Sequence, residues 1–235
     1  MKVKIKYLLF IMIVTISLVS GCKGNNNDLI KQLDKMQTYI DENKIFDDDY
    51  HFLLTTNSYD ENFKLSIVKD NNDYYVELKE DNKSIKSWIL LENDEYVVYC
   101  DDSKKTFKHL NVADSYLALK TVIESMNLEY INFDLKNIYK SVKVNIENLI
   151  KSCNEDTNTC EIEKKLFSKV TFMINSKISD DTDANIDFFL HNGKLVDMNY
   201  QIKKDDIVHE NSWHFDYKNQ SIKLENKDEY ILVYN

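Results

Sequence analysis

The chain has 235 residues, of which 43% are hydrophobic, and it carries a formal net charge of −10 at pH 7. A chain of this size buries enough surface to fold without a metal or a disulfide framework. Every one of its 30 Lys and Arg positions is a lysine. Because the chain lacks arginine forks and its negative charge repels phosphates, we expect no nucleic-acid partner.

The first 21 residues have the parts of a secretory signal peptide in the usual order. Lys2, Lys4 and Lys6 form a basic segment, residues 7–19 are apolar, and small residues precede Cys22. The apolar stretch is shorter than the roughly 20 residues that a membrane-spanning helix needs. The sequence therefore predicts a signal peptide over residues 1–21 that is cleaved rather than kept as an anchor.

Residues 18–22, with the sequence LVSGC, resemble the lipobox of bacterial lipoproteins, although valine stands where leucine is commoner. The resemblance implies that a diacylglyceryl group is attached to the Cys22 sulfur, that the chain is cut after Gly21, and that residues 22–28 form a lipid-anchored tether. Two or more acyl chains hold a protein stably on a membrane. We therefore expect a lipoprotein on the extracytoplasmic face of the cell membrane; an uncleaved leader with an ordinary cysteine is the alternative.

A helix is predicted from about residue 29 to residue 42, because apolar residues recur there at helical spacing. These residues are Leu29, Ile30, Leu33, Met36 and Ile40. Six β-rich runs follow between residues 50 and 110, separated by Asp, Asn and Lys clusters, which predicts an antiparallel meander. Glycine is scarce, so some of the turns must place Asn or Asp at positive φ.

Two helices are expected between this meander and a second one. Asn111 can cap the first helix, and Asp134 can cap the second, in which seven apolar residues between 135 and 150 recur at helical spacing. Strand-like runs return near residue 160, and they include 221–226 and 230–234. The order predicts an α+β fold in which one domain, residues 29–235, has a large curved, half-barrel-like antiparallel sheet covered by a few helices. Two smaller α+β units also fit this order.

The layout resembles the lipoprotein-carrier fold, the LolA and LppX-like group, mainly over residues 73–110, "DYYVELKEDNKSIKSWILLENDEYVVYCDDSKKTFKHL". In that group an N-terminal helix precedes an unclosed half-barrel, and central helices plug its concave face. The resemblance implies a groove between sheet and helices that accepts a lipid or another hydrophobic ligand. The chain lacks the family's Gly-rich hairpins and has no Arg, so no ligand-contacting residue is carried over. The 15 Tyr and 11 Phe residues suit such a groove and equally suit an ordinary core.

Glycine content argues against three large classes of enzyme. Beyond the leader only Gly24 and Gly193 remain, too few for a Walker loop, a dinucleotide-binding loop or a nucleophile elbow. Ser66 and Lys69 match the S-x-x-K motif, but in a strand they point to opposite faces. We expect no catalytic site and no cofactor.

Two segments partly match metal-binding motifs. In "HENSWH" the H-E-x-x-H pattern would need histidine at Trp213, and the separation of His209 from His214 puts them on opposite faces of a strand. In "DDTDAN", residues 180–185, the glycine and the bidentate glutamate of a calcium loop are replaced by Ile186 and Asn192. We expect no metal site, and a polar hairpin turn at 180–185.

Three cysteines remain besides Cys22. Cys153 and Cys160 bracket a polar loop and would close a ring of eight residues, worth about 2.5 kcal/mol in the chain-entropy model. A disulfide there suits an extracytoplasmic protein, and two free thiols are the alternative. Cys100 lies in an apolar run and is expected to be buried.

Two functions are consistent with the sequence, neither of them enzymatic. The first is a membrane-anchored lipoprotein that binds a lipid or another hydrophobic ligand in a groove between sheet and helices. The second is a surface lipoprotein that mediates protein–protein or host interaction without an internal cavity. A continuous apolar cavity would favour the first, and a filled core would favour the second.

Overall fold

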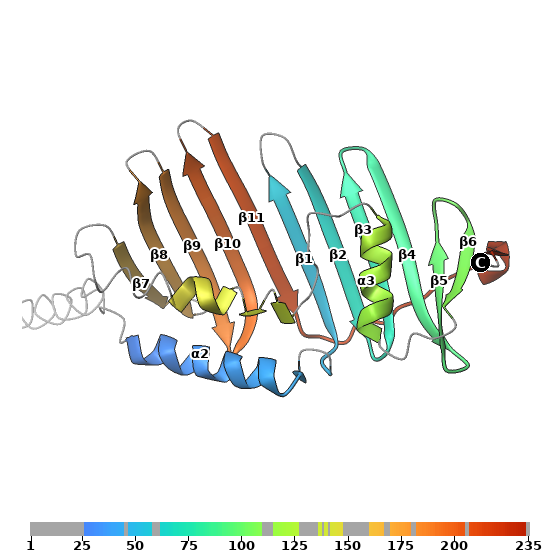
Figure 1. The fold of residues 1–235 in the computed structure, drawn as a ribbon, viewed down its shortest axis with the longest axis horizontal. Helices are drawn as coiled ribbons and strands as arrows, with labels where there is room; N and C mark the ends of the chain where they lie inside the picture. The colour runs from blue at the N-terminus through green and yellow to red at the C-terminus, as the bar shows by residue number, and fades with distance from the viewer. Residues whose placement is uncertain are drawn as a thin grey trace, which may run out of the picture.

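The structure, a computed structural model, describes residues 26–44, 47–57, 62–109, 115–126, 136–137, 139–140, 142–147, 160–166, 170–179, 182–204 and 207–233. Over these residues the chain forms one large open sheet with few helices, seen face-on in Figure 1. The predicted signal peptide, Cys22 and the start of the tether lie outside the described residues.

The first meander contains six strands close to those expected. They are β1 (Tyr50–Asn57), β2 (Asn62–Asp70), β3 (Asp73–Glu80), β4 (Lys83–Glu92), β5 (Glu95–Cys100) and β6 (Lys105–His109). Its turns place Asn71, Asp81, Asn93 and Asp94 at positive φ, which confirms the expectation that Asn and Asp replace glycine there. Lys104 also has positive φ, which the sequence does not signal.

The second meander supplies five strands and a short final strand. They are β7 (Cys160–Leu166), β8 (Val170–Ser179), β9 (Thr182–His191), β10 (Lys194–Lys204), β11 (Ile207–Asp216) and β12 (Ile231–Val233). β8 and β9 pair antiparallel, with Ser179 opposite Thr182. Residues 182–185 of the expected turn are therefore the start of β9 instead, and residues 180–181 lie outside the described part. The strands β1 to β11 pair with one another antiparallel, and β12 is parallel to β6.

The two meanders join through β1 and β11, which gives the strand order β12-β6-β5-β4-β3-β2-β1-β11-β10-β9-β8-β7. These two strands pair antiparallel from His51 opposite Asp216 to Asn57 opposite Glu210. Both blocks of strands therefore belong to one continuous sheet, and the centre of that sheet is made from its first and eleventh strands.

Helix α2 (Asn26–Asp41) confirms the first predicted helix, but it begins three residues earlier than expected, so residues 26–28 of the predicted tether are helical. Leu29, Leu33, Met36 and Ile40 are buried as expected, but Ile30 is 45% exposed, and Tyr39 is buried on the inner face instead. Figure 1 shows α2 running along the ends of β8 to β11. The helix therefore closes one end of the sheet.

The central helices also form, as far as the structure describes them. Helix α3 (Ser115–Ser125) lies in front of β3 and β4 in Figure 1. Residues 136–137, 139–140 and 142–147 are helical as well. Each segment buries apolar residues of its expected stripe, namely Leu119 and Ile123 in the first and Tyr139, Val142 and Ile146 in the second. The expected caps Asn111 and Asp134 lie outside the described residues.

One face of the sheet carries the core. Along β1 Tyr50, Phe52 and Leu54 are buried while the residues between them are half-buried, as alternation in a strand requires. The inner residues form a single cluster with buried side chains of α2, α3 and the helical residues 139–146. We call this the inner face and the opposite side the outer face.

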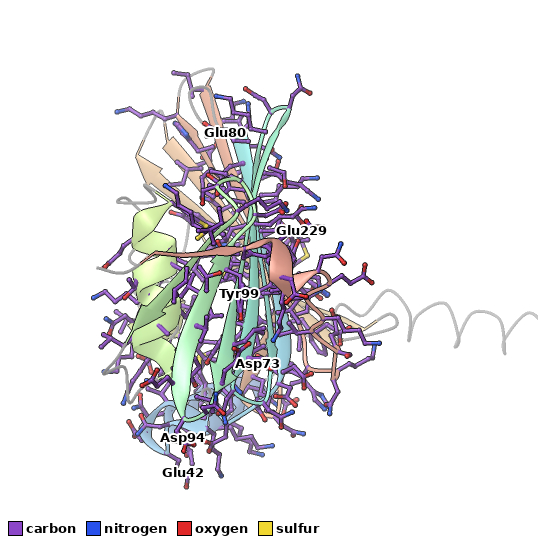
Figure 2. The ribbon with its side chains drawn as sticks, turned by 90° about the vertical axis from the view of Figure 1, so that its right-hand side faces the viewer. Glu42, Asp73, Glu80, Asp94, Tyr99 and Glu229 are labelled. Carbon is purple, nitrogen blue, oxygen red and sulfur yellow. The ribbon has the colours of Figure 1, made fainter. Side chains whose placement is uncertain are left out.

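The segment after β11 crosses the outer face. The expected strand at 221–226 is wrong, because this segment has no ladder partner. Ile222 and Leu224 alternate with exposed residues because they pack against a small outer cluster, which consists of Leu90, Val97 and Tyr99. Figure 2 shows α3 on one side of the sheet and Glu229, in the short 3-10 helix η2 (Lys227–Glu229), on the other.

Candidate functional site

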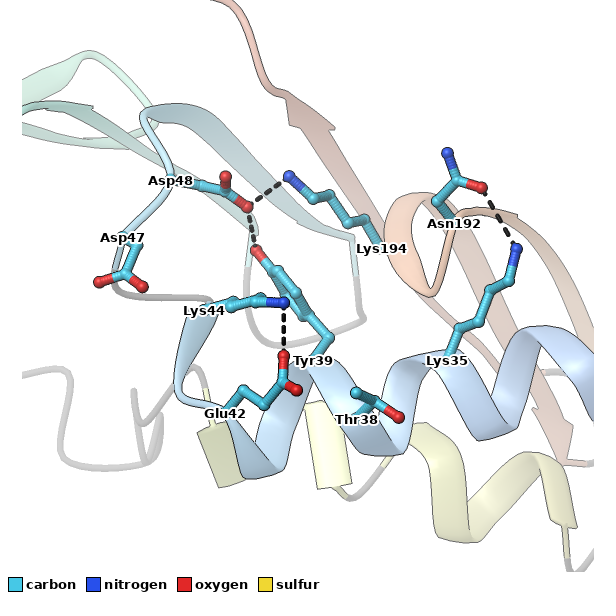
Figure 3. Close-up of a pocket in the computed structure, with 9 residues that line it drawn as sticks. All are labelled: Lys35, Thr38, Tyr39, Glu42, Lys44, Asp47, Asp48, Asn192 and Lys194. Atoms are coloured by element: carbon cyan, nitrogen blue, oxygen red, sulfur yellow. Dashed lines mark hydrogen bonds and ion pairs between the residues drawn. The ribbon is translucent and has the colours of Figure 1, made fainter.

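An open groove of about 510 Å³ lies where α2 ends against the sheet. It is built from the C-terminal half of α2, the link to β1 and the β9–β10 turn, and Figure 3 shows its side chains. They are Lys35, Thr38, Tyr39, Glu42, Lys44, Asp47, Asp48, Asn192 and Lys194. We call this the α2 groove.

Asp48 is the centre of the α2 groove. Its Oδ2 accepts a hydrogen bond from the Tyr39 hydroxyl at 2.6 Å and lies 2.5 Å from Lys194 Nζ (Figure 3). The Lys194 ammonium also lies 5.4 Å from the centre of the Tyr39 ring and 4.8 Å from that of Tyr217. The carboxylate and the two rings thus hold one ammonium group between α2 and the sheet.

Two further contacts cross or line the groove. Lys44 is paired with Glu42, and Lys35 Nζ donates to Asn192 Oδ1 at 3.4 Å. Three lysines and three carboxylates line the groove, so its formal charges balance. The contact between Lys35 and Asn192 joins α2 to the β9–β10 turn, and the groove offers no concentrated charge to a ligand.

Beneath the groove, three residues form a closed ring of hydrogen bonds. The Leu195 N–H donates to the Tyr139 hydroxyl at 3.1 Å, and the Tyr217 hydroxyl donates to the Leu195 carbonyl at 2.8 Å. The two hydroxyls also contact each other, so Tyr139 donates its proton to Tyr217. The β10–β11 ladder begins only at Asp197, and the tyrosines therefore satisfy the backbone of a residue that β11 does not reach.

Burial keeps these tyrosines neutral. It is the main cause that raises the pKa of Tyr39 and Tyr217 well above the usual value of 10.0, and neighbouring Tyr139 raises both further. The pKa of Tyr139 is raised too, again mainly by burial. Near neutral pH the three hydroxyls therefore act as hydrogen-bonding groups and do not supply a general base.

A second groove, of about 440 Å³, lies between the first half of α2 and the ends of β8 and β9. Charged and amide side chains of α2, among them Lys31 and Gln32, face Phe172, Phe189 and Leu190 across it. Its lining is mixed, and neither of the two grooves is the continuous apolar cavity that would favour a lipid carrier.

Among the residues that the structure describes, aromatic rings pack against one another on the inner face. Phe52 lies with its ring centre 4.6 Å from that of Phe215, and Phe215 is 5.8 Å from Tyr217 and 5.9 Å from Tyr139. The Trp213 ring stands edge-on to Phe52 at 6.2 Å. The sequence predicts Tyr139 on a helix and the other rings in strand-like runs, but not that they meet, because their contacts depend on the pairing of β1 with β11.

Only two of the four cysteines, Cys100 and Cys160, lie among the residues that the structure describes. Cys22 and Cys153 lie outside the described residues, and Cys160 begins β7, so the anchor and the Cys153–Cys160 disulfide stay predictions. Cys100 is a free thiol. It is half-buried rather than buried, because it ends β5, and burial raises the pKa of its thiol.

The HENSWH segment lies in strand β11 and the S-x-x-K motif lies in strand β2, both extended as expected. His209 and His214 are both in β11 and both exposed, and His214 Nδ1 lies 2.6 Å from Asp197 Oδ1. Within the described ranges no three His, Cys, Asp or Glu side chains gather as a metal site. In β2, Lys69 is buried on the inner face, 3.7 Å from Asp49, while Ser66 faces outward.

Ser66 has a partner that the sequence does not reveal. Its Oγ lies 2.9 Å from Nε2 of His51, which is on the neighbouring strand β1. Burial lowers the pKa of His51, and His214 lowers it further. The Asp197 carboxylate, on the same outer face, contacts His214 and not His51, so the serine and this carboxylate contact different imidazoles.

No protein-family model matches the chain, and no curated protein matches it in sequence. None of the helices in the described part is long and apolar enough to cross a membrane.

Proposed function

We propose that the protein is a lipid-anchored extracytoplasmic lipoprotein, not an enzyme, that binds a lipid or another hydrophobic ligand between a curved, half-barrel-like sheet and its helices. The observation that carries this proposal is the layout. The chain contains, in order, a helix, six antiparallel strands, central helices and five more antiparallel strands. The strands form one open sheet, and the apolar face of this sheet is turned towards the helices. This layout resembles that of the lipoprotein-carrier group, with its N-terminal helix, unclosed half-barrel and central helices.

The anchor is supported by the sequence of residues 1–22 alone. Its test is Cys22→Ser in a bacterial host that processes lipoproteins. We expect the wild-type chain to incorporate labelled palmitate and to sediment with the membrane fraction, and the variant to lose the label. Cys100→Ser is the matched control and should stay labelled; an unchanged label in Cys22→Ser would exclude the lipoprotein assignment.

The ligand is tested separately by native mass spectrometry of the gently extracted protein, followed by solvent extraction of whatever it carries. A bound lipid or another apolar molecule, released on unfolding, is the expected result. A clean mass for the protein with its own anchor alone, under conditions that preserve other lipid complexes, would contradict the carrier proposal.

A second function is favoured by a different observation. The described inner face is filled by aromatic side chains around Phe52 and Phe215, and the two described grooves are partly polar. A filled core suits a surface lipoprotein that binds another protein or a host molecule. In that case native mass spectrometry gives the mass of the anchored protein without a bound ligand. The partner then has to be identified by crosslinking on intact cells.

A further inference from the structure

Helix α2 begins very close in the chain to the proposed anchor. Asn26, the first residue of α2, comes four residues after Cys22. Whatever path the chain follows between them, four residues span at most about 14 Å. An acylated Cys22 lies at the headgroups of a bilayer, so the start of α2 must lie within about 14 Å of that level.

This short span decides which part of the sheet is near the bilayer. α2 begins on the β8 side of the sheet and ends towards β1 (Figure 1), and its first half lies across the ends of β8 and β9. The sheet has twelve strands among the described residues, and at about 4.8 Å between neighbours it is about 50 Å wide. The edge formed by β6 and β12 is therefore much farther from the anchor than the first half of α2.

The charge along α2 changes in the direction that an anionic bilayer would select. Residues 22–35 contain three lysines and two aspartates, a net charge of +1, whereas residues 36–49 contain five carboxylates and one lysine, a net charge of −4. Two of these carboxylates pair with lysines of the sheet, which leaves −2. α2 is about 24 Å long, more than twice the screening length of about 10 Å. An anionic surface thus attracts the first half of α2 and repels its far end.

The first half of α2 also offers the bilayer an apolar side chain. Ile30 is 45% exposed, while the other apolar residues of α2 are buried. It lies about 6 Å from the start of the helix, on the part nearest the anchor. Lys31 and Lys35 are exposed beside it, and a lysine can lay its apolar stem on a lipid surface while its ammonium group reaches a phosphate.

We propose that the exposed side of the first half of α2, residues 28–35, is a membrane-contact surface. On it, Ile30 enters the headgroup region of an anionic bilayer, and the last turn of α2 points away from the lipid. This inference rests on the proposed function, because it needs the anchor at Cys22, and it names the lipid surface as the partner of the anchored domain. It also orients the sheet, with the edge formed by β6 and β12 held away from the bilayer.

Lipid quenching of tryptophan tests this contact in the full-length lipoprotein. Ile30→Trp places a probe on the proposed surface, and Ile231→Trp places a matched probe in β12, at a residue that is 71% exposed on the far edge of the sheet. Each acylated protein is reconstituted into vesicles of phosphatidylglycerol and phosphatidylcholine, with or without bromine on the acyl carbons nearest the headgroup. The wild-type chain gives the contribution of Trp88 and Trp213. We expect the brominated lipid to quench the added emission of Ile30→Trp and to leave that of Ile231→Trp unchanged.

Lys31→Trp, at the next exposed position, repeats the test if circular dichroism shows that Ile30→Trp does not fold. An acylated, vesicle-bound protein in which neither added tryptophan is quenched would overturn this inference and leave the lipoprotein assignment standing. Equal quenching at both positions would overturn it too, because the whole width of the sheet would then lie along the bilayer. A chain that carries no acyl group and does not float with the vesicles would refute the anchor itself, and this inference with it.

Discussion

Gly193, in the β9–β10 turn, lies directly against the backbone of Lys35 in α2. A Cβ added at Gly193 would sit 2.5 Å from the Lys35 carbonyl carbon and 2.6 Å from the Met36 nitrogen. The Gly193 N–H also donates to Gln32 Oε1 at 3.0 Å, and its φ is +79°. The one glycine of the sheet therefore fixes how closely α2 approaches it.

We expect Gly193→Ala to lower the free energy of unfolding by about 2 kcal/mol or more, because it combines a strained φ with a clash against backbone atoms. Urea unfolding measures this. Asn192→Gly is the control, since it removes only exposed contacts, with Lys35 and His191, at a positive φ that glycine adopts easily, and it should change stability by less than about 0.5 kcal/mol. A mild effect of Gly193→Ala would mean that α2 is not held at this turn.

The hydroxyl ring around Leu195 predicts a coupled effect. Tyr139→Phe leaves the buried Leu195 N–H without its acceptor and should cost about 1–3 kcal/mol of the free energy of unfolding. Tyr217→Phe opens the same ring, so the double variant should cost less than the sum of the two. Tyr200→Phe, a half-buried tyrosine outside the ring, is the control. Additive single costs would show that the ring does not act as a unit.

The outer face predicts a pH dependence. Burial, and then the neighbouring His214, hold the pKa of His51 below its usual value of 6.5, while Asp216 acts in the opposite direction. The unfolded chain therefore binds a proton more readily than the folded one, so this contribution to stability is present above about pH 6.5 and is lost as the pH falls through the folded pKa. His51→Gln should make the loss of stability between about pH 7.5 and about pH 5.5 shallower. His209→Gln, at an exposed site of β11, should leave the slope unchanged, and an identical slope in His51→Gln would refute the assignment.

The segment that crosses the outer face should be needed to cover Leu90, Val97 and Tyr99. We expect the pair Ile222→Asn and Leu224→Asn to lower the free energy of unfolding by about 1–2 kcal/mol, because it removes apolar contacts from that cluster. Trp88 packs against the same cluster, so its emission should shift to the red. Lys223→Asn, the exposed residue between the two, should do neither; an unchanged Trp88 spectrum in the pair would show that the segment does not shield the cluster.

Much of the secondary structure could be predicted from the sequence, because alternation and helical spacing are local. The helix at α2 and the strands β1 to β6 follow from such patterns. The sequence does not predict that Tyr39 is buried on the inner side of α2 while Ile30 is exposed. The position of Tyr39 depends on its contacts with Asp48 and Lys194, and both residues lie outside the helix. The wrong prediction of a strand at 221–226 also has a physical cause. Apolar and polar residues alternate in any half-buried extended segment, whether or not a neighbouring strand pairs with it.

The candidate site was less accessible from the sequence. The contacts of Tyr139 with Tyr217, of His51 with Ser66, and of Thr56 with Asn211 all join different elements. No motif spacing encodes them, since each depends on strand register or on where a helix lies. In the sequence Trp213 is only the residue that interrupts an H-E-x-x-H pattern, and the lack of an acceptor among the described residues for its buried indole nitrogen follows from the folded structure.

The pairing of β1 with β11 has a consequence for how the chain reaches its native state. Thr56 and Asn211, bonded across this pair, are 155 residues apart, so the centre of the sheet has a high contact order and closes a long loop of chain. Each meander can form from neighbouring hairpins, but until β11 arrives both present a bare central edge and an uncovered apolar face. We expect this last ladder to be the slow step of folding, and the period before it forms to be the time at which the chain is most prone to aggregate.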